Sequence, residues 1–406
     1  MSTPQVSIVM SVYNGERYLQ EAIDSVLNQT FTDFEFIIVN DGSTDTTWDI
    51  LTSYDDPRIR LVRNQENIGL TKSLNKGLAL AQGEYIARQD ADDISLPERL
   101  ERQVEFLDHN RYVGLVSSSF IEINEQGEEI RSRSLPVDND TIQQSLLCYN
   151  CFCHGAVVLR KECLEKVGSY REGFASAQDY DLWLRIAEHF NVANIGEPLY
   201  KWRVHSRSIS VVHKAPQDEF ARLAVESAIE RRVAGKHKLG DLCAKSLGRY
   251  YLWQAIQRYA EDHVTQAHHS LLAGIAYDPS LSKDHGFVTE SILTFGQAAY
   301  PSLSPCQAAI RLTDKVFASL PAGADGMEAI KSTVLGKCYA MAAFEDYQCG
   351  NLARVRRDAI FAYFNDPSWF KNRGVLSILL ESFIGPKAMN RVRGITHRLI
   401  KRSADG

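Results

Sequence analysis

The chain has 406 residues, of which 44% are hydrophobic and 24% charged, and its formal net charge at pH 7 is −6. These values are typical of an ordinary globular protein, the length predicts two or three domains, and the negative charge gives no reason to expect a nucleic-acid partner. Neither the N-terminus nor residues 375–384, the most apolar stretch, has the pattern of a signal peptide or a membrane span. We therefore expect a cytoplasmic protein.

The first third of the chain alternates short apolar runs with amphipathic segments. The apolar runs predict strands at residues 7–12, 34–39, 59–62 and 84–87. Apolar residues at helical spacing predict helices over residues 19–27, 70–81 and 97–107. This order of elements predicts an α/β domain with a mostly parallel, Rossmann-like sheet and helices on both faces.

Polar residues follow each of the four predicted strands. They are Tyr13 and Asn14, then Asn40 and Asp41, then Arg63 and Asn64, and finally the run Asp90-Ala91-Asp92-Asp93. Because such sheets bind ligands at the carboxyl ends of their strands, we expect these groups to form one site. Asp41 is in a position to bind a nucleoside, while one of its neighbours caps the following helix.

The acids after the fourth strand predict a metal site. Without a cation, Asp90, Asp92 and Asp93 would repel one another and take up a proton. Carboxylates suit Mg²⁺ or Mn²⁺, which bridge to diphosphate oxygens. A solvated acidic turn is the alternative, and the position at the edge of the sheet favours the metal.

Helical spacing dominates after about residue 215. Residues 259–280 resemble residues 347–368, and each segment has Asp-Pro-Ser after a predicted helical hairpin of the tetratricopeptide kind. Two copies are fewer than the three or more units that a repeat array usually needs. We predict a first domain over residues 1–215 and a helical accessory domain over residues 216–406.

Thiols and one imidazole gather in a short segment, at Cys148, Cys151, Cys153, His154 and Cys163. Structural zinc sites usually combine two well-separated ligand pairs, which this spacing lacks. We therefore interpret the segment as buried thiols rather than a zinc site, and in a reducing compartment we expect the eight cysteines to be free.

Four motifs in the first half occur in a fixed order. They are residues 6–15, the Asn40-Asp41-Gly42-Ser43 turn, Asn67-Ile68-Gly69-Leu70 and Asp90-Ala91-Asp92-Asp93. Together they resemble the family-2 glycosyltransferases of the GT-A fold, over about residues 5–210. The resemblance implies inverting transfer of a sugar from a nucleotide-sugar donor, usually a UDP- or dTDP-sugar, with Mn²⁺ or Mg²⁺.

The resemblance also implies roles for the residues at the strand ends. It places Tyr13 and Asp41 on the nucleoside, with Asn14 beside them, and Asp90 near the ribose. Asp92 matches the metal ligand, with Asp93 next to it.

The segment of residues 69–77 departs from one common family pattern. Leu74 precedes Asn75 where that pattern has arginine. Lys72 could supply the missing contact with the base, and a plain exposed lysine is the alternative.

A later acidic motif, Gln178-Asp179-Tyr180-Asp181, resembles the part of the family that carries the general base. Asp179 matches that base, while Gln178 replaces the usual glutamate. A carboxylate is needed because a sugar hydroxyl is a poor nucleophile until a base takes its proton. Asp181 is the competing candidate, which we interpret instead as a cap of the helix that follows.

Residues 203–210 resemble the family's Arg-x-His-x-x-Ser-x-Ser segment. Arg203 and Ser208 are expected to reach the diphosphate, and His205 to bind the metal or the diphosphate. His154 matches a position beside the acceptor cleft.

Two other functions compete with sugar transfer. A nucleotidyltransferase would need a glycine-rich loop with a basic residue after the first strand, which residues 12–16 lack. A non-catalytic sugar-binding scaffold would have no reason to retain the clustered acids.

A glycan or lipid-linked acceptor is expected from the resemblance, and so is a place in cell-surface polysaccharide synthesis. Between Lys387 and Arg402 six residues are basic and none is acidic. This pattern predicts either a helix lying on the inner membrane surface or an ordinary packed surface helix.

Overall fold

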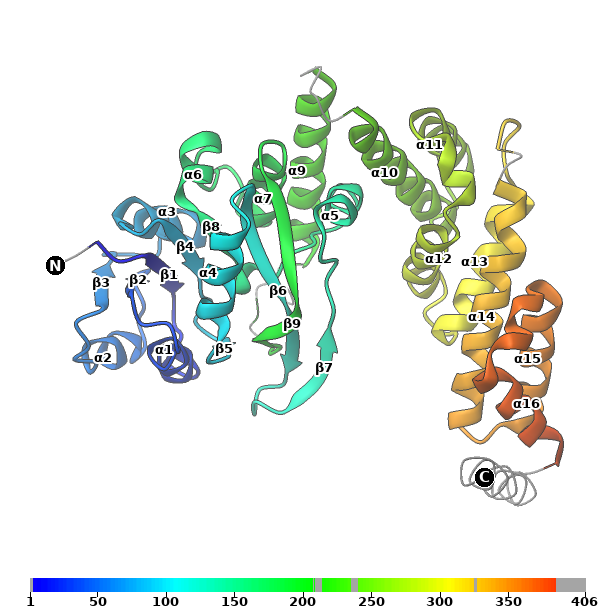
Figure 1. Cartoon of the computed structure of the whole chain (residues 1–406), viewed down its shortest axis with the longest axis horizontal. Helices are drawn as coiled ribbons and strands as arrows, with labels where there is room; N and C mark the ends of the chain where they lie inside the picture. The colour runs from blue at the N-terminus through cyan, green and yellow to red at the C-terminus, as the bar shows by residue number, and fades with distance from the viewer. Residues whose placement is uncertain (1–2, 207, 209–213, 235–239, 325–326, 385–406) are drawn as a thin grey trace, which may run out of the picture. The chain divides into compact units, whose positions relative to one another are not determined.

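The computed structural model describes residues 3–206, 208, 214–234, 240–324 and 327–384 (Figure 1). The basic segment between Lys387 and Arg402 lies outside these residues. The chain divides into two compact units, Met1–Ser246 and Leu247–Gly406. Among the described helices, none is long and apolar enough to cross a membrane.

The division between the units differs from the predicted boundary after residue 215. Helix α9 (Lys214–Ala234) packs on α7 (Gln178–Ala187) and so belongs to the first unit. Arg231 of α9 forms an ion pair with Glu188 at 2.8 Å.

A mixed sheet of nine strands forms the first unit, in the order β3-β2-β1-β4-β8-β6-β9-β5, with β7 paired to β6. The strands are β1 (Val6–Val12), β2 (Phe34–Asn40), β3 (Ile59–Arg63), β4 (Tyr85–Arg88), β5 (Ile94–Ser95), β6 (Val113–Ile123), β7 (Glu129–Arg133), β8 (Val158–Arg160) and β9 (Asn191–Arg203). The first four pair in parallel, as predicted. Strand β8 runs antiparallel to both β4 and β6, so the sheet as a whole is mixed.

The helices of the first unit connect these strands. They are α1 (Leu19–Leu27), α2 (Thr47–Thr52), α3 (Leu70–Leu80), α4 (Arg99–His109), α5 (Asn139–Ser145), the 3₁₀ turn η1 (His154–Ala156), α6 (Lys161–Val167), α7 and α9. The predicted helices at residues 19–27, 70–81 and 97–107 correspond to α1, α3 and α4.

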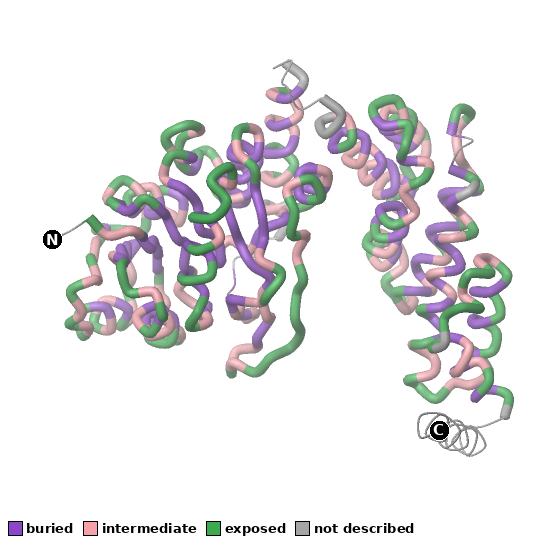
Figure 2. Tube along the Cα trace, in the orientation of Figure 1, coloured by how far each residue is buried: buried purple, intermediate pink, exposed green. Residues whose placement is uncertain are grey.

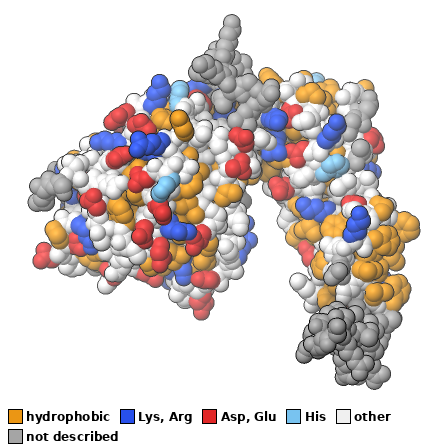
Figure 3. Space-filling view, in the orientation of Figure 1, with side chains coloured by type: hydrophobic (Ala, Val, Ile, Leu, Met, Phe, Trp, Pro, Cys, Tyr) orange, Lys and Arg blue, Asp and Glu red, His pale blue; other side chains and the backbone are white. Residues whose placement is uncertain are grey.

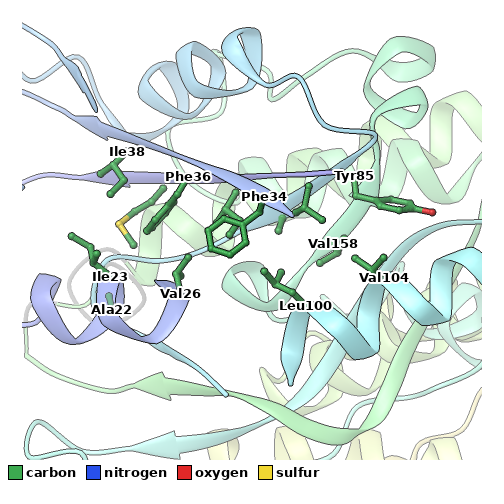
Figure 4. Packing of buried hydrophobic residues seen from close by; sticks show 14 of the residues in the cluster. Ala22, Ile23, Val26, Phe34, Phe36, Ile38, Tyr85, Leu100, Val104 and Val158 are labelled. Carbon is green, nitrogen blue, oxygen red and sulfur yellow. The ribbon is translucent and has the colours of Figure 1, made fainter. Parts of the chain in front are cut away.

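Successive side chains of the central strands point to opposite faces of the sheet, and different helices cover the two faces. Phe36 and Ile38 of β2 point toward α1 and α4, where they pack with Ile23 and Leu100 (Figure 4). The intervening side chains point to the other face, where α3 lies against the sheet. There a Cβ at Gly77 would lie 2.6 Å from Val9 Cγ1, so the absence of a side chain lets α3 approach closely.

Burial follows this layering, since the central strands are buried along most of their length (Figure 2). Strand β1 is buried at every position, as expected for a parallel strand with helices on both faces. The sheet therefore holds its strand ends rigidly, and the loops that follow them carry the candidate site.

The second unit is helical. Its elements are α10 (Gly240–Ala260), which begins in the first unit, α11 (Val264–Tyr277), η2 (Pro279–Lys283), α12 (His285–Ala299), α13 (Pro305–Ala318), α14 (Glu328–Gln348), α15 (Leu352–Asn365), η4 (Pro367–Lys371) and α16 (Arg373–Ile384). The predicted resemblance between its two halves has a structural counterpart. Asp278 accepts a hydrogen bond from Ser280 N at the start of η2, and Asp366 accepts one from Ser368 N at the start of η4.

Candidate active site

The strand ends that were expected to converge lie at one edge of the sheet. Val12 pairs with Asn40 across β1 and β2, and Val9 pairs with Arg88 across β1 and β4. Tyr13 follows β1 with 48% of its surface exposed. Its neighbour Asn14 has a left-handed backbone (φ 50°), and its Oδ1 accepts a hydrogen bond from Thr44 N at 2.9 Å. Asn14 thus joins the loop after β1 to the loop after β2.

Asp41 is buried, with 2% of its surface exposed, and binds the chain rather than facing solvent. One carboxylate oxygen accepts hydrogen bonds from Asn64 Nδ2 at 2.8 Å and Ile68 N at 2.9 Å, and the other accepts from Gly69 N at 2.9 Å. This arrangement differs from the expected contact with a nucleoside, because Asp41 here fixes the loop that leads into α3. Lys72, one turn further on, is exposed on that helix.

The three acids after β4 have three different surroundings. Asp92 is the most accessible, with 37% of its side chain exposed, and its Oδ2 lies 2.8 Å from His205 Nε2. The ring of Tyr18 packs 5.2 Å from the His205 ring, and its buried hydroxyl finds no hydrogen-bond partner among the described residues. Ser208, which is buried, accepts a hydrogen bond from His205 N at 3.2 Å and so shapes this turn.

Asp93 faces the interior, contrary to the expected place beside the metal. Its Oδ1 accepts a hydrogen bond from the backbone N of Arg203 at 2.8 Å, and 2% of its surface is exposed. Burial raises the pKa of Asp93 well above its ordinary value, and the negative charges of Asp92 and Asp90 raise the pKa further. Asp93 therefore holds β9 against the acidic loop.

Arg203 was expected to reach the diphosphate, but its side chain is 2% exposed. Its Nε donates to Asp92 O at 2.8 Å, and its guanidinium forms an ion pair with Glu21 of α1. The same group lies 4.5 Å from the centre of the Tyr18 ring. Arg203 thus positions the backbone of Asp92 from behind.

These residues fit a divalent cation in a restricted way. The described part of the chain contains no group of three or more histidine, cysteine, aspartate or glutamate residues arranged to hold a metal. Asp92 and His205 supply two neighbouring ligand atoms, and the Tyr18 ring packs beside His205. Mg²⁺ is commonly bound by one or two carboxylates, with substrate phosphates and water completing its coordination, so Asp92 suits such an ion and His205 would add a nitrogen ligand beside it.

Asp179 lies in the first turn of α7, preceded by Ala177 in a left-handed conformation (φ 53°). Such a backbone is costly for a residue with a side chain, and it is often found at functional sites. The Asp179 carboxylate is partly exposed and accepts a hydrogen bond from Asn150 Nδ2 at 3.0 Å. It is accessible to a second molecule.

Asp181 differs from the expectation that it caps α7. It lies within the helix, is fully buried, and accepts hydrogen bonds from Arg185 Nε at 2.9 Å and Arg171 at 3.3 Å. Its carboxylate is therefore part of a buried ion pair and is enclosed by protein.

A buried network that the sequence did not reveal pairs with Asp90 and lies within electrostatic range of Asp179. Arg88, which is 1% exposed, forms an ion pair with Asp90 and donates from Nε to His154 Nε2 at 3.1 Å. His154 Nε2 is also 3.0 Å from the Tyr170 hydroxyl. Burial and the charge of Arg88 lower the pKa of His154, while nearby Asp90 and Asp179 act in the opposite direction. The imidazole is thus electrostatically coupled to both carboxylates.

The Arg88 charge also acts on Asp90. Burial tends to raise the pKa of this carboxyl, but Arg88 and His154 more than offset burial and leave the pKa below its ordinary value. Asp90 therefore stays ionised in its half-buried position. Arg88 directly follows the predicted strand of residues 84–87, but its partner His154 is 66 residues away, and sequence position alone does not indicate this pairing.

Comparison with known proteins identifies the family to which this chain is similar. Residues 7–168 match the model of glycosyl transferase family 2. The putative glycosyltransferase EpsE of Bacillus subtilis is 39% identical over 212 residues, which are 50% of this chain and 75% of that protein. The O-antigen biosynthesis glycosyltransferase WbnJ of Escherichia coli is 36% identical over 50% of this chain and 81% of its own.

A solved structure, S. aureus TarS 1-349 in complex with UDP-GlcNAc, has 17% sequence identity and a TM-score of 0.49, and covers 85% of this chain and 92% of that one. The family is established by the sequence relatives. With its mixed sheet, flanking helices and acidic strand ends, the chain belongs to glycosyl transferase family 2 and is a glycosyltransferase.

Proposed function

We propose that the chain transfers a sugar, with inversion, from a nucleoside-diphosphate sugar to an acceptor hydroxyl, with Asp179 as the general base. A UDP-sugar is the first candidate donor, as the family resemblance implies. The observation that carries the proposal is a pair of partly exposed acids in the first unit, Asp92 beside His205 and Asp179 at the start of α7. A buried network of Arg88, His154 and Tyr170 pairs with Asp90 and is close enough to Asp179 for its charge to act on His154 and Tyr170.

The reaction is a single displacement. Asp179 takes the proton of the acceptor hydroxyl as its oxygen bonds to the anomeric carbon, and the bond from that carbon to the diphosphate breaks. The diphosphate leaves with the electron pair. Attack opposite to the leaving group inverts the anomeric configuration.

The donor side has to balance the charge of the departing diphosphate. Mn²⁺ or Mg²⁺ held by Asp92 and His205 would supply positive charge there. Arg203 and Asp93 keep the backbone of Asp92 in place. Tyr13, exposed at the end of β1, is available to stack on the base.

We further propose an acceptor in polysaccharide synthesis. Two relatives have names that point there, the O-antigen biosynthesis glycosyltransferase WbnJ and the amylovoran biosynthesis glycosyltransferase AmsE of Erwinia amylovora. A glycan or lipid-linked acceptor would carry the hydroxyl that Asp179 deprotonates.

A thermal-shift screen of nucleotides and nucleotide sugars, each with and without Mn²⁺, tests the donor side. A ligand at one hundred times its dissociation constant should add about 2.7 kcal/mol to the free energy of unfolding. We expect stabilisation by one class of nucleoside diphosphate, and only with the metal. Equal melting temperatures with every nucleotide would contradict the proposal.

A further inference from the structure

The second unit has a surface rich in exposed hydrophobic side chains, which we call the aromatic face. It consists of Ile360, Phe361, Phe364, Phe370, Leu380 and Phe383, from α15, η4 and α16. Phe364 is 81% exposed, and Phe370 and Phe383 are each 60% exposed. Hydrophobic side chains gather on the same part of the second unit in the space-filling view (Figure 3). Contiguous apolar surface of this kind usually marks an interaction site.

Contacts through Arg356 and Tyr363 of α15 link the three elements that carry the aromatic face. The guanidinium of Arg356 on α15 lies 5.5 Å from the Phe383 ring of α16. Phe370 of η4 stacks on Tyr363 at 4.1 Å. Phe361 and Phe364 are three residues apart on one side of α15, which is the spacing of neighbours on a helix surface.

The internal resemblance of this unit provides a comparison for the aromatic face. A Cβ at Gly248 would lie 2.6 Å from Asp278 Cβ, and a Cβ at Gly336 would lie 2.7 Å from Asp366 Cβ, so the two halves pack alike. At the same spacing along the chain, the positions of Phe361, Phe364 and Phe370 are occupied in the first half by Ala273, Ala276 and Ser282. The first half therefore folds without these three rings. In the second half Phe361 stacks on Tyr339 and Phe370 on Tyr363, while Phe364 remains 81% exposed.

The elements that carry the aromatic face have only basic side chains exposed among their described residues. Within residues 352–384, the exposed charged side chains among those described are Arg354, Arg356, Arg357 and Lys371. Arg354 lies 4.0 Å from Asp346 of α14 and Arg357 pairs with Asp358 at 2.6 Å, so Arg356 and Lys371 are the charges that a partner would meet. The acids of this stretch are turned inward, because Asp358 and Glu381 are buried and Asp366 caps η4. An anionic partner would complement this surface.

We propose that the aromatic face docks on an anionic lipid bilayer. Phenylalanine and leucine would enter the boundary between headgroups and acyl chains, while the arginine and lysine heads would remain among the lipid phosphates. A second copy of the chain fits less well, because a symmetric dimer through this surface would bring like charges together. The proposal concerns the second unit and does not depend on the donor or the base assigned above.

Sedimentation of the full chain with vesicles tests the proposal. The variant Phe361→Ala, Phe364→Ala, Phe370→Ser introduces the residues of the first half and leaves residues 385–406 unchanged. We expect the wild type to pellet with vesicles of phosphatidylcholine and phosphatidylglycerol. The partition coefficient of the variant should be lower by a factor of about ten or more. Tyr112→Ser, which removes an 85% exposed ring from the first unit, is the matched control and should bind as the wild type does.

The double variant Arg356→Gln, Lys371→Gln tests the charges without altering the aromatic rings, and should also bind the anionic vesicles more weakly. Vesicles of phosphatidylcholine alone should recover little protein. Equal pelleting of the wild type and both variants would overturn the proposal, as would wild-type protein that stays in solution. A dimer in size-exclusion chromatography that the triple variant abolishes, with vesicle binding unaffected, would identify a second copy as the occupant instead.

Discussion

Asp179 and Asp181 are two residues apart on α7, yet their surroundings give them different tasks. Asp179 is partly exposed and has one amide partner, Asn150. Asp181 is fully buried between Arg185 and Arg171. A carboxylate that must meet an acceptor hydroxyl has to be accessible, so only Asp179 can act as the proposed base.

Substitution by asparagine should separate these two tasks. Asp179→Asn keeps the shape and removes the proton acceptor, so transfer should fall by about 10² to 10⁴ with little change in donor affinity. Asp181→Asn leaves the buried arginines without a full counter-charge, and should lower the free energy of unfolding by roughly 3 kcal/mol. Steady-state kinetics and thermal melts of both variants measure these effects. A large kinetic loss in well-folded Asp181→Asn, with none in Asp179→Asn, would show that the base is misassigned.

Asp92 and Asp93 are a second pair of neighbouring acids, and their side chains differ in exposure: Asp92 is partly exposed and Asp93 is buried. Asp92→Ala removes one of the two proposed ligand atoms and should abolish metal-dependent donor binding in a folded protein. Asp93→Asn alters a buried hydrogen bond to Arg203 N, and should lower stability while donor binding still responds to Mn²⁺. Calorimetric titration with UDP, with and without Mn²⁺, measures both responses. Unchanged Mn²⁺-dependent binding in Asp92→Ala would contradict this assignment.

At the residue scale, the sequence predicted the edge of the sheet at which the acids lie. It did not predict the direction in which each side chain points. Asp41, Asp93 and Arg203 all lie in motifs at the strand ends, yet their side chains turn inward and hold loops. A motif specifies position along the chain, whereas the direction of a side chain depends on partners elsewhere in sequence, which are the loop before α3 for Asp41, β9 for Asp93 and α1 for Arg203. Arg88 and His154 could not be joined from sequence for the same reason.

At the element scale, the strands with uninterrupted apolar runs were predicted closely. The long strands β6 and β9 were not recognised. Strand β6 buries Ser117, Ser118 and Ser119, so it lacks an apolar pattern at its centre. Strand β9 contains Pro198, and its pairing with β6 shifts register near that residue. Both strands depend on each other for pairing, which local sequence does not show.

The helical hairpins give a prediction for a single glycine. A Cβ at Gly336 of α14 would lie 2.7 Å from Asp366 Cβ, so Gly336→Ala must move the start of η4. We expect it to lower the free energy of unfolding by about 1–3 kcal/mol. Gly286→Ala is the matched control, because the nearest atom to its Cβ would be Asp284 Oδ1 at 3.8 Å. Denaturant unfolding of the two variants tests this, and equal stability would contradict the close packing.

At the scale of the whole molecule, the match to the family model concerns the first unit, whereas the proposal of lipid binding concerns the second. The family model matches residues 7–168, and the relatives EpsE and WbnJ each align with half of this chain. The match to the family model therefore lies in the first unit, which also holds the acids and α7. The second unit adds the aromatic face, whose proposed contact with lipid would bring the enzyme to a surface that presents lipid-linked acceptors.

Hydrolysis of a nucleotide sugar, followed by proton NMR, tests the central claim most directly. Water can take the place of the acceptor, so the free sugar reports both turnover and the anomeric configuration. The account predicts Mn²⁺- or Mg²⁺-dependent release of the inverted anomer from at least one nucleotide sugar, and its loss by about 10² or more in Asp179→Asn. The account would be contradicted if the anomer released first had the retained configuration. It would also be contradicted if Asp179→Asn released the sugar at the wild-type rate.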